Sequence, residues 1–199
     1  MIHRFIAFEG CDFTGKSTQL QKLADYLEKA GKPHIITSDL YKTDIGKLAK
    51  DFLKNKSKTA KEKVEKVIDA RKVNYESLIE PALRNHKIVL CDRYTTSTLV
   101  FQGKLADYDI DKIKNEQERR KIQEPNIVLV FDTTAEIILK RREGREENDN
   151  LDPQNKDDIE KILTAYRELV KTEPNHYLIN ANKKPEEVFE AVLKVLKLI

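Results

Sequence analysis

Eight residues near the N-terminus have the types and spacing needed to hold a polyphosphate. The stretch Gly10-Cys-Asp-Phe-Thr-Gly15-Lys16-Ser17 matches the pattern G-x-x-x-x-G-K-[ST] and lies between an apolar run and a helical pattern. A glycine-bearing loop before a helix presents several backbone N–H groups to phosphate oxygens. Lys16 would contact the β- and γ-phosphates, and the Ser17 hydroxyl would bind Mg²⁺. The pattern therefore predicts a nucleoside triphosphate site.

A carboxylate and a guanidinium follow a second apolar run, residues 88–91. Asp92 and Arg93 come directly after it. An acidic residue that leaves an apolar strand is typical of a second support for magnesium, generally through a water molecule. The alternative is a surface Asp–Arg pair, which contributes little. Because the phosphate loop is also present, we predict Ser17 and Asp92 as the metal-binding residues.

Arg71 lies on the apolar face of a predicted helix. Helical spacing places it in one stripe with Val67, Ile68 and Tyr75. An arginine at such a position must extend to the rim or meet an acceptor, because an unpaired buried charge is prohibitive. Extension to the rim is the commoner outcome. If the face lines a cleft instead, the guanidinium suits a carbonyl oxygen or a phosphate.

The elements that would position these groups alternate between strand and helix. Short apolar runs predict strands at 5–8, 34–37, 88–91, 127–131 and 177–179. Helical spacing of apolar residues marks 20–27, 159–170 and 188–196. This alternation predicts an α/β fold, a doubly wound parallel five-stranded sheet with helices on both faces, which binds ligands at the carboxyl ends of its strands. We expect one domain over residues 1–199. The lysine-rich segment 54–63 reads as a surface loop.

Composition excludes several classes of protein. The 199 residues carry 37 Lys+Arg against 34 Asp+Glu, and a net charge of +3 gives no field that would favour nucleic acid or an anionic membrane. The longest apolar run, 127–131, is far shorter than the roughly 20 residues of a membrane helix. Two cysteines, Cys11 and Cys91, allow no disulfide framework. We expect a cytoplasmic protein with neither a nucleic-acid nor a membrane partner. In it both thiols stay reduced; the alternative is that oxidants modify them and block the phosphate loop.

Several segments resemble the thymidylate kinase family of P-loop nucleoside monophosphate kinases. Residues 92–103, Asp-Arg-Tyr-Thr-Thr-Ser-Thr-Leu-Val-Phe-Gln-Gly, are similar to the family signature D-R-[YH]-x-x-S-x-x-A-Y-Q-G, with Val for Ala and Phe for Tyr. The opening segment 5–10, the aspartate inside the phosphate loop, the turn Thr43-Asp-Ile-Gly46 and the segment 124–132 are also similar. The likeness runs through essentially the whole chain. The signature block is its specific part, since many families share the phosphate loop.

The resemblance implies that the chain phosphorylates dTMP to dTDP with ATP and Mg²⁺, a step of dTTP synthesis, and that it forms a homodimer through the 64–85 and 97–103 regions. Asp12 would bind the 3′-hydroxyl group of the acceptor, Arg93 its phosphate, and Arg71 the thymine O4. The implied catalytic set is Lys16, Arg93, Arg145 and Asp12. The implied ATP-binding set is Gly10, Cys11, Asp12, Phe13, Thr14, Gly15, Lys16, Ser17, Thr18, Arg141 and Arg142, the two arginines opening a short lid at about 141–153. The implied dTMP-binding set is Asp12, Val67, Arg71, Arg93, Ser97, Thr98, Phe101 and Gln102.

The chain departs from the family pattern at three positions. Val67 stands where members often carry a phenylalanine that stacks on thymine, the segment before Thr43 lacks an arginine, and Asn150 replaces the second lid arginine. Three alternatives therefore stay open: a kinase for another nucleoside monophosphate or a nucleoside, a nucleotide-dependent switch, and a non-catalytic relative. The switch class carries an N-K-x-D motif, which the segment 182–185 only begins to match.

Overall fold

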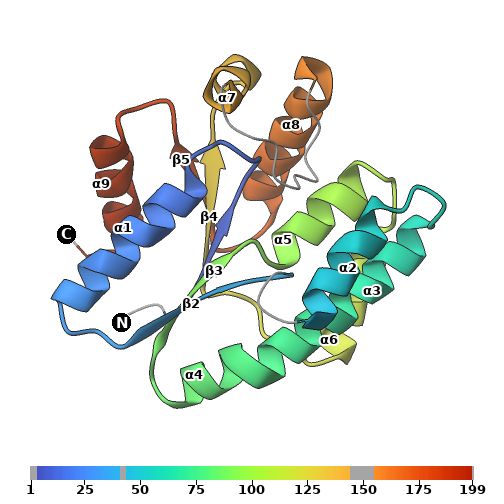
Figure 1. The fold of residues 1–199 in the computed structure, drawn as a ribbon, viewed down its shortest axis with the longest axis horizontal. Helices are drawn as coiled ribbons and strands as arrows, with labels where there is room; N and C mark the ends of the chain where they lie inside the picture. The colour runs from blue at the N-terminus through green and yellow to red at the C-terminus, as the bar shows by residue number, and fades with distance from the viewer. Residues whose placement is uncertain (1–3, 41–43, 144–154, 199) are drawn as a thin grey trace.

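A computed structural model describes residues 4–40, 44–143 and 155–198, and a parallel sheet forms its centre (Figure 1). The strand order is β2-β3-β1-β4-β5, and all four pairings are parallel. The strands are β1 (Phe5–Glu9), β2 (His34–Ser38), β3 (Ile88–Asp92), β4 (Ile127–Asp132) and β5 (His176–Asn180). The predicted α/β fold is confirmed, and each predicted strand is present. A single domain over the whole chain stays a prediction.

Helices cover both faces of the sheet, as the unbroken apolar strands require. On one face, α1 (Lys16–Lys29) and α9 (Pro185–Val195) contact alternate strand residues such as Phe8 and Leu129. On the other, α8 (Lys156–Thr172) and the neighbouring helices contact the residues in between, such as Ala7 and Val128. Figure 1 shows α1 and α9 on one side of the strands and α8, α5, α3 and α2 on the other. None of the helices in the described ranges combines the length and apolar character that crossing a membrane requires.

The remaining helices connect the strands. They are α2 (Asp44–Lys54), α3 (Ala60–Asn74), the π-helical turn η1 (Tyr75–Ile79), α4 (Glu80–Arg84), α5 (Thr95–Thr98), the π-helical turn η2 (Leu99–Lys104), α6 (Ile110–Arg119) and α7 (Ala135–Arg142). The pair formed by α2 and α3 lies across from the start of α1, with α5 nearby (Figure 1).

The prediction of a surface loop over 54–63 is wrong in its second half, because α3 begins at Ala60. Thr59 and Glu62 form a capping box: the Thr59 hydroxyl accepts from Glu62 N at 3.2 Å, and the Glu62 carboxylate accepts from Thr59 N at 2.9 Å. This exchange satisfies two N–H groups of the first turn. Helical structure therefore extends to Lys63, which the sequence reading had placed in a loop.

Candidate active site

The phosphate loop has the backbone geometry that its glycines permit. Gly10 has a φ of 131°, and a Cβ atom there would lie 2.6 Å from the Phe131 carbonyl oxygen. Gly15 has a φ of 96° directly before α1. The Thr14 hydroxyl donates to the Cys11 carbonyl at 2.8 Å and closes the loop on itself. The loop thus joins β1 to the N-terminus of a long helix, the arrangement that binds phosphates.

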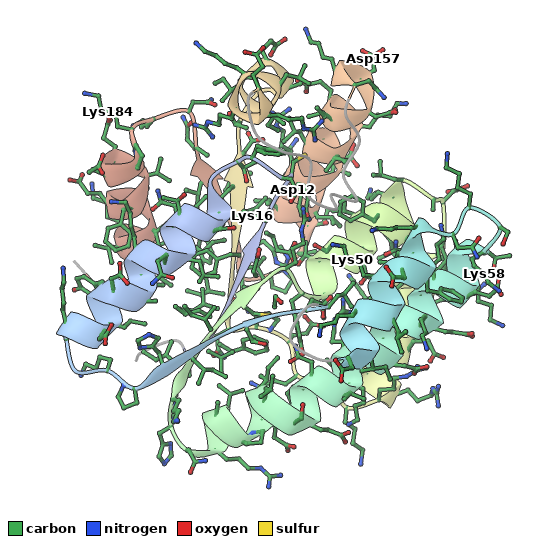
Figure 2. The ribbon with its side chains drawn as sticks, in the orientation of Figure 1. Asp12, Lys16, Lys50, Lys58, Asp157 and Lys184 are labelled. Carbon is green, nitrogen blue, oxygen red and sulfur yellow. The ribbon has the colours of Figure 1, made fainter. Side chains whose placement is uncertain are left out.

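Asp12 joins the predicted donor and acceptor sites. Its Oδ1 atom accepts from Lys16 Nζ at 3.1 Å and from an Arg93 guanidinium nitrogen at 2.7 Å. Burial alone would raise the pKa of Asp12, but the positive charges of Arg93 and Lys16 hold it well below its usual value. Figure 2 shows Asp12 and Lys16 close together where the loop enters α1. The ionised carboxylate therefore brings the phosphate-loop lysine and the arginine after β3 to one point.

A cavity of about 220 Å³ opens beside this point. All of the predicted acceptor residues except Arg71 line it, namely Asp12, Val67, Arg93, Ser97, Thr98, Phe101 and Gln102, and so does Asp92, which was predicted to bind the metal. Four lining residues were missed from the sequence, namely Asp39, Leu40, Leu53 and Lys63. They come from the end of β2, from α2 and from the first turn of α3, and no motif marks these positions. Only the folding of α2 and α3 over the end of β2 brings them to the wall.

Arg71 pairs with a carboxylate inside the protein and does not reach the rim. It is fully buried and is not among the residues that line the cavity. Its Nε and one terminal nitrogen donate to the two carboxylate oxygens of Asp39, at 2.8 and 2.6 Å. Further donors contact Thr98 Oγ1 at 2.8 Å and Gln117 Oε1 at 2.6 Å. Direct contact with thymine stays a prediction, and the guanidinium lies behind Asp39 and Thr98.

Glu9 is a site residue that the sequence reading missed. It is fully buried at the end of β1, where its oxygens accept from Tyr94 N at 2.7 Å, Ser97 N at 3.2 Å, Ser97 Oγ at 2.7 Å and the Tyr166 hydroxyl at 3.0 Å. Burial raises the pKa of Glu9, and its hydrogen-bond donors and the charge of Arg93 oppose that shift. Arg93 itself has a φ of 60°, in the left-handed region. Glu9 therefore holds the start of α5 next to a strained arginine, a combination typical of functional sites.

Glu9→Ala should lower the free energy of unfolding by about 3 kcal/mol or more, because two buried backbone N–H groups lose their acceptor and each costs about 1–3 kcal/mol. Glu9→Gln keeps an acceptor oxygen for both and should cost less than half as much. Urea denaturation of the two variants measures the difference. Equal costs for alanine and glutamine would contradict this account of Glu9.

The predicted ATP-binding arginines at the end of α7 contact the phosphate loop. Arg141 donates to the carbonyl oxygens of Phe13 at 3.2 Å and Thr14 at 3.1 Å, and to that of Ala181 at 2.9 Å. The Arg142 guanidinium lies 5.0 Å from the centre of the Phe13 ring. These contacts tie α7 to the loop from outside. The predicted catalytic Arg145 falls outside the described residues.

The side chains predicted to hold magnesium supply oxygen atoms, as Mg²⁺ requires. Asp92 lines the cavity, and its Oδ1 atom is buried without a hydrogen-bond partner within the described residues. Ser17 lies in the first turn of α1 and is exposed, next to exposed Thr18. Across residues 4–40, 44–143 and 155–198, no three acidic, histidine or cysteine side chains form a cluster that could hold a metal ion. A carboxylate oxygen left without a donor and a helix-start hydroxyl fit an ion held mainly by phosphates and water.

Both cysteines are fully buried. Burial raises the pKa of the Cys91 thiol well above its ordinary value, with the nearby carboxylates of Asp39, Asp92 and Glu9 adding to the shift. Its sulfur donates to the Arg93 carbonyl at 3.0 Å. Since the thiolate is the reactive form, the structure favours an unreactive Cys91 that fills space.

Comparison with known proteins agrees with this site. The family model described as thymidylate kinase matches residues 8–192. A thymidylate kinase of Fervidobacterium nodosum is 30% identical over 96% of this chain and 97% of its own length. Those of Mesoplasma florum and Finegoldia magna are each 33% identical, over 96% and 97% of this chain and 94% and 97% of their own lengths. The chain belongs to the thymidylate kinase family.

Proposed function

We propose that this protein transfers the γ-phosphoryl group of ATP to dTMP, giving ADP and dTDP. The observation that carries the proposal is the position of Asp12: one of its carboxylate oxygens, Oδ1, accepts hydrogen bonds from both Lys16 and Arg93. A lysine that binds the donor phosphates and an arginine that binds the acceptor phosphate must converge if the two substrates are to react. The cavity beside them has room for the acceptor.

The main energetic obstacle to this reaction is the repulsion between the negatively charged phosphate groups of its two substrates. Two phosphate groups a few ångströms apart repel each other by about 4 kcal/mol per pair of unit charges at an effective dielectric near 20. We propose that Lys16 and Arg93 offset this repulsion and stabilise the charge on the migrating group. Mg²⁺ bound near Ser17 and Asp92 would supply further positive charge at the β- and γ-phosphates. The acceptor phosphate is already anionic, so no residue is assigned as a general base.

The acceptor side of the cavity combines polar and aromatic groups. We propose that Ser97, Thr98 and Gln102 supply hydrogen bonds to the acceptor and that Phe101 lies below its deoxyribose. The Arg93 guanidinium lies 5.6 Å from the centre of the Phe101 ring, so these two residues are neighbours in the cavity wall. Arg141 and Arg142 support the donor side through the phosphate loop, and we propose that Arg145 covers the bound ATP.

We also propose a homodimer. Val73 and Leu78 lie within the predicted contact region, and 39% and 38% of their surface is exposed. Leu105, just beyond the second predicted region, is 40% exposed. Exposed large apolar side chains in or beside both predicted contact regions support an interface there. Sedimentation equilibrium tests this, with twice the chain mass as the expected result. A cytoplasmic location and the absence of a nucleic-acid partner stay predictions from the sequence.

A coupled assay of ADP release with a panel of acceptors tests the reaction. We expect ATP- and Mg²⁺-dependent turnover with dTMP, weaker turnover with purine monophosphates, and none with thymidine. Faster turnover with thymidine than with dTMP would indicate a nucleoside kinase. Nucleotide binding without ADP release for any acceptor would indicate a non-catalytic relative. Either result would contradict the proposed function.

A further inference from the structure

The position of the Arg93 guanidinium depends on partners from several elements. The backbone of Arg93 is tied to β1, because its N–H donates to the Phe8 carbonyl at 2.9 Å. Its long side chain can still adopt many rotamers, and ordering them costs free energy. One terminal nitrogen donates to Asp12 at 2.7 Å, and the other donates to the hydroxyl oxygens of Ser97 at 3.4 Å and Tyr166 at 3.3 Å. These contacts hold the guanidinium in the cavity wall.

Tyr166 is a buried residue of α8 and is not among the described residues that line the cavity. Its hydroxyl donates to Glu9 Oε2 at 3.0 Å, and the Ser97 hydroxyl donates to the same atom at 2.7 Å. A hydroxyl group has a single proton, so each of the two oxygens keeps its lone pairs for other donors. Both hydroxyl groups therefore accept from Arg93 while they donate to Glu9.

Glu9 supplies the negative charge that sets the direction of these hydrogen bonds. Its Oε1 atom accepts from the backbone N–H groups of Tyr94 and Ser97, and its Oε2 atom accepts from the two hydroxyl groups. Four donors occupy the acceptor sites of an ionised carboxylate. A charged acceptor at one end and a charged donor at the other strengthen the hydrogen bonds between them. The carboxylate thus holds Arg93 through the hydroxyl groups of Ser97 and Tyr166.

We propose that Tyr166 is a positioning residue, which holds the Arg93 guanidinium where it binds the phosphate of the acceptor nucleotide. In the proposed reaction Asp12 also binds the 3′-hydroxyl group of the acceptor, so its contact with Arg93 is shared with a substrate. Tyr166 lies behind the cavity wall, so a bound nucleotide does not compete for its hydroxyl. Placement matters because displacing a group that orients a substrate by about 1 Å can cost about 100-fold in rate. This inference rests on the proposed function, because it names the residue that orients the acceptor-binding arginine of that reaction.

Tyr166→Phe removes the hydroxyl group and keeps the ring that packs in the core. We expect kcat/KM for dTMP to fall about 10-fold, the lower end of the range for losing a hydrogen bond to a charged group, because Ser97 still accepts from the same nitrogen. The calorimetric dissociation constant for dTMP should rise, whereas that for thymidine, which has no phosphate, should stay unchanged. Tyr26→Phe is the matched control. Within the described residues the Tyr26 hydroxyl makes no hydrogen bond, and its ring lies on α1 against Phe189, so all three values should stay unchanged.

Glu9→Gln tests the same hydrogen bonds from their other end. The amide nitrogen of glutamine donates, so one of the two hydroxyl groups must accept from it and turn its own proton toward Arg93. This variant should also weaken the binding of dTMP and leave the binding of thymidine unchanged. Arg93→Met removes the group that Tyr166 positions. Adding Tyr166→Phe to Arg93→Met should therefore cause no further loss of dTMP affinity.

Three outcomes would overturn the proposal. Equal weakening of dTMP and thymidine binding in Tyr166→Phe would mean that the hydroxyl only stabilises the cavity as a whole. Unchanged dTMP binding in both Tyr166→Phe and Glu9→Gln would mean that Arg93 needs no such support. A further loss of dTMP affinity on adding Tyr166→Phe to Arg93→Met would mean that Tyr166 acts through another group. If the unaltered protein transferred no phosphate to dTMP, the proposed function would fail. The dissociation constants would still decide the role of Tyr166, since they require no turnover.

Discussion

Lys16→Met should lower kcat by about 10²- to 10³-fold and leave the free energy of unfolding nearly unchanged. Lys16 is only 5% exposed, and its ammonium lies 3.1 Å from Asp12, at the point where the donor and acceptor sites meet. Removing one preorganised electrostatic contact to the charge of a transition state costs about this much. Asp12 keeps its ion pair with Arg93 in the variant, so no buried charge is left alone.

Single-turnover kinetics at saturating ATP and dTMP measure this loss, because they separate the transfer step from substrate binding. Lys22→Met is the matched control. Lys22 lies in the same helix, and its partner Glu186 is 3.2 Å away on the surface. Exposed pairs contribute about 1 kcal/mol or less, and Lys22 does not line the cavity. A Lys16→Met variant that kept more than a tenth of the normal rate would remove Lys16 from the chemistry.

Asp39→Ala should lower the free energy of unfolding by about 3–5 kcal/mol. Arg71 is fully buried, and its strongest acceptor is the Asp39 carboxylate, 2.6 Å away. Removing one member of a buried ion pair leaves the other charge without compensation, and this costs more than the pair itself contributes. Arg71→Met should also destabilise the fold, because the remaining Asp39 carboxylate is only 4% exposed and loses its partner.

Urea denaturation of the single variants and of the double variant Asp39→Ala/Arg71→Met measures the coupling between the two residues. We expect the double variant to be less destabilised than the sum of the single ones. Asp69→Ala serves as the control. Asp69 lies on the exposed side of α3, the helix that carries Arg71, and pairs with Arg120 at 3.0 Å. It should cost about 1 kcal/mol or less. Equal effects of Asp39→Ala and Asp69→Ala would show that burial of the Arg71 pair does not stabilise the fold.

The π-helical turns η1 and η2 could not be predicted from the sequence. The apolar stripe that contains Arg71 and Tyr75 predicts one helix, and η1 continues α3 from Tyr75 without a break. A π-helical turn adds one residue to a helical turn and so changes which side chains face the neighbouring helix. η2 contains Phe101 and Gln102, so the orientation of two predicted acceptor residues depends on a feature that no local pattern marks.

The features that could be predicted from the sequence alone are those determined by interactions between residues close together in the chain. Strands at the five apolar runs, the phosphate loop with its two glycines, and the aspartate and arginine after β3 all follow from residues adjacent in the chain. Backbone sterics and the periods of helix and strand act over a few residues, so these features can be read directly. The similarity to a family then added the roles of the acceptor residues.

Only the tertiary structure decided which partner each buried charge finds. Arg71 meets Asp39 across 32 positions of the chain, and Glu9 meets Ser97 across 88. Helical spacing had placed Arg71 on the inner face of its helix, but it could not tell an acceptor inside the protein from a ligand in a cleft. Lys63 joined the cavity wall because a capping box started α3 early enough to include it. Periodicity fixes the direction in which a side chain points, whereas the packing of distant elements fixes what lies there, and that depends on the whole chain.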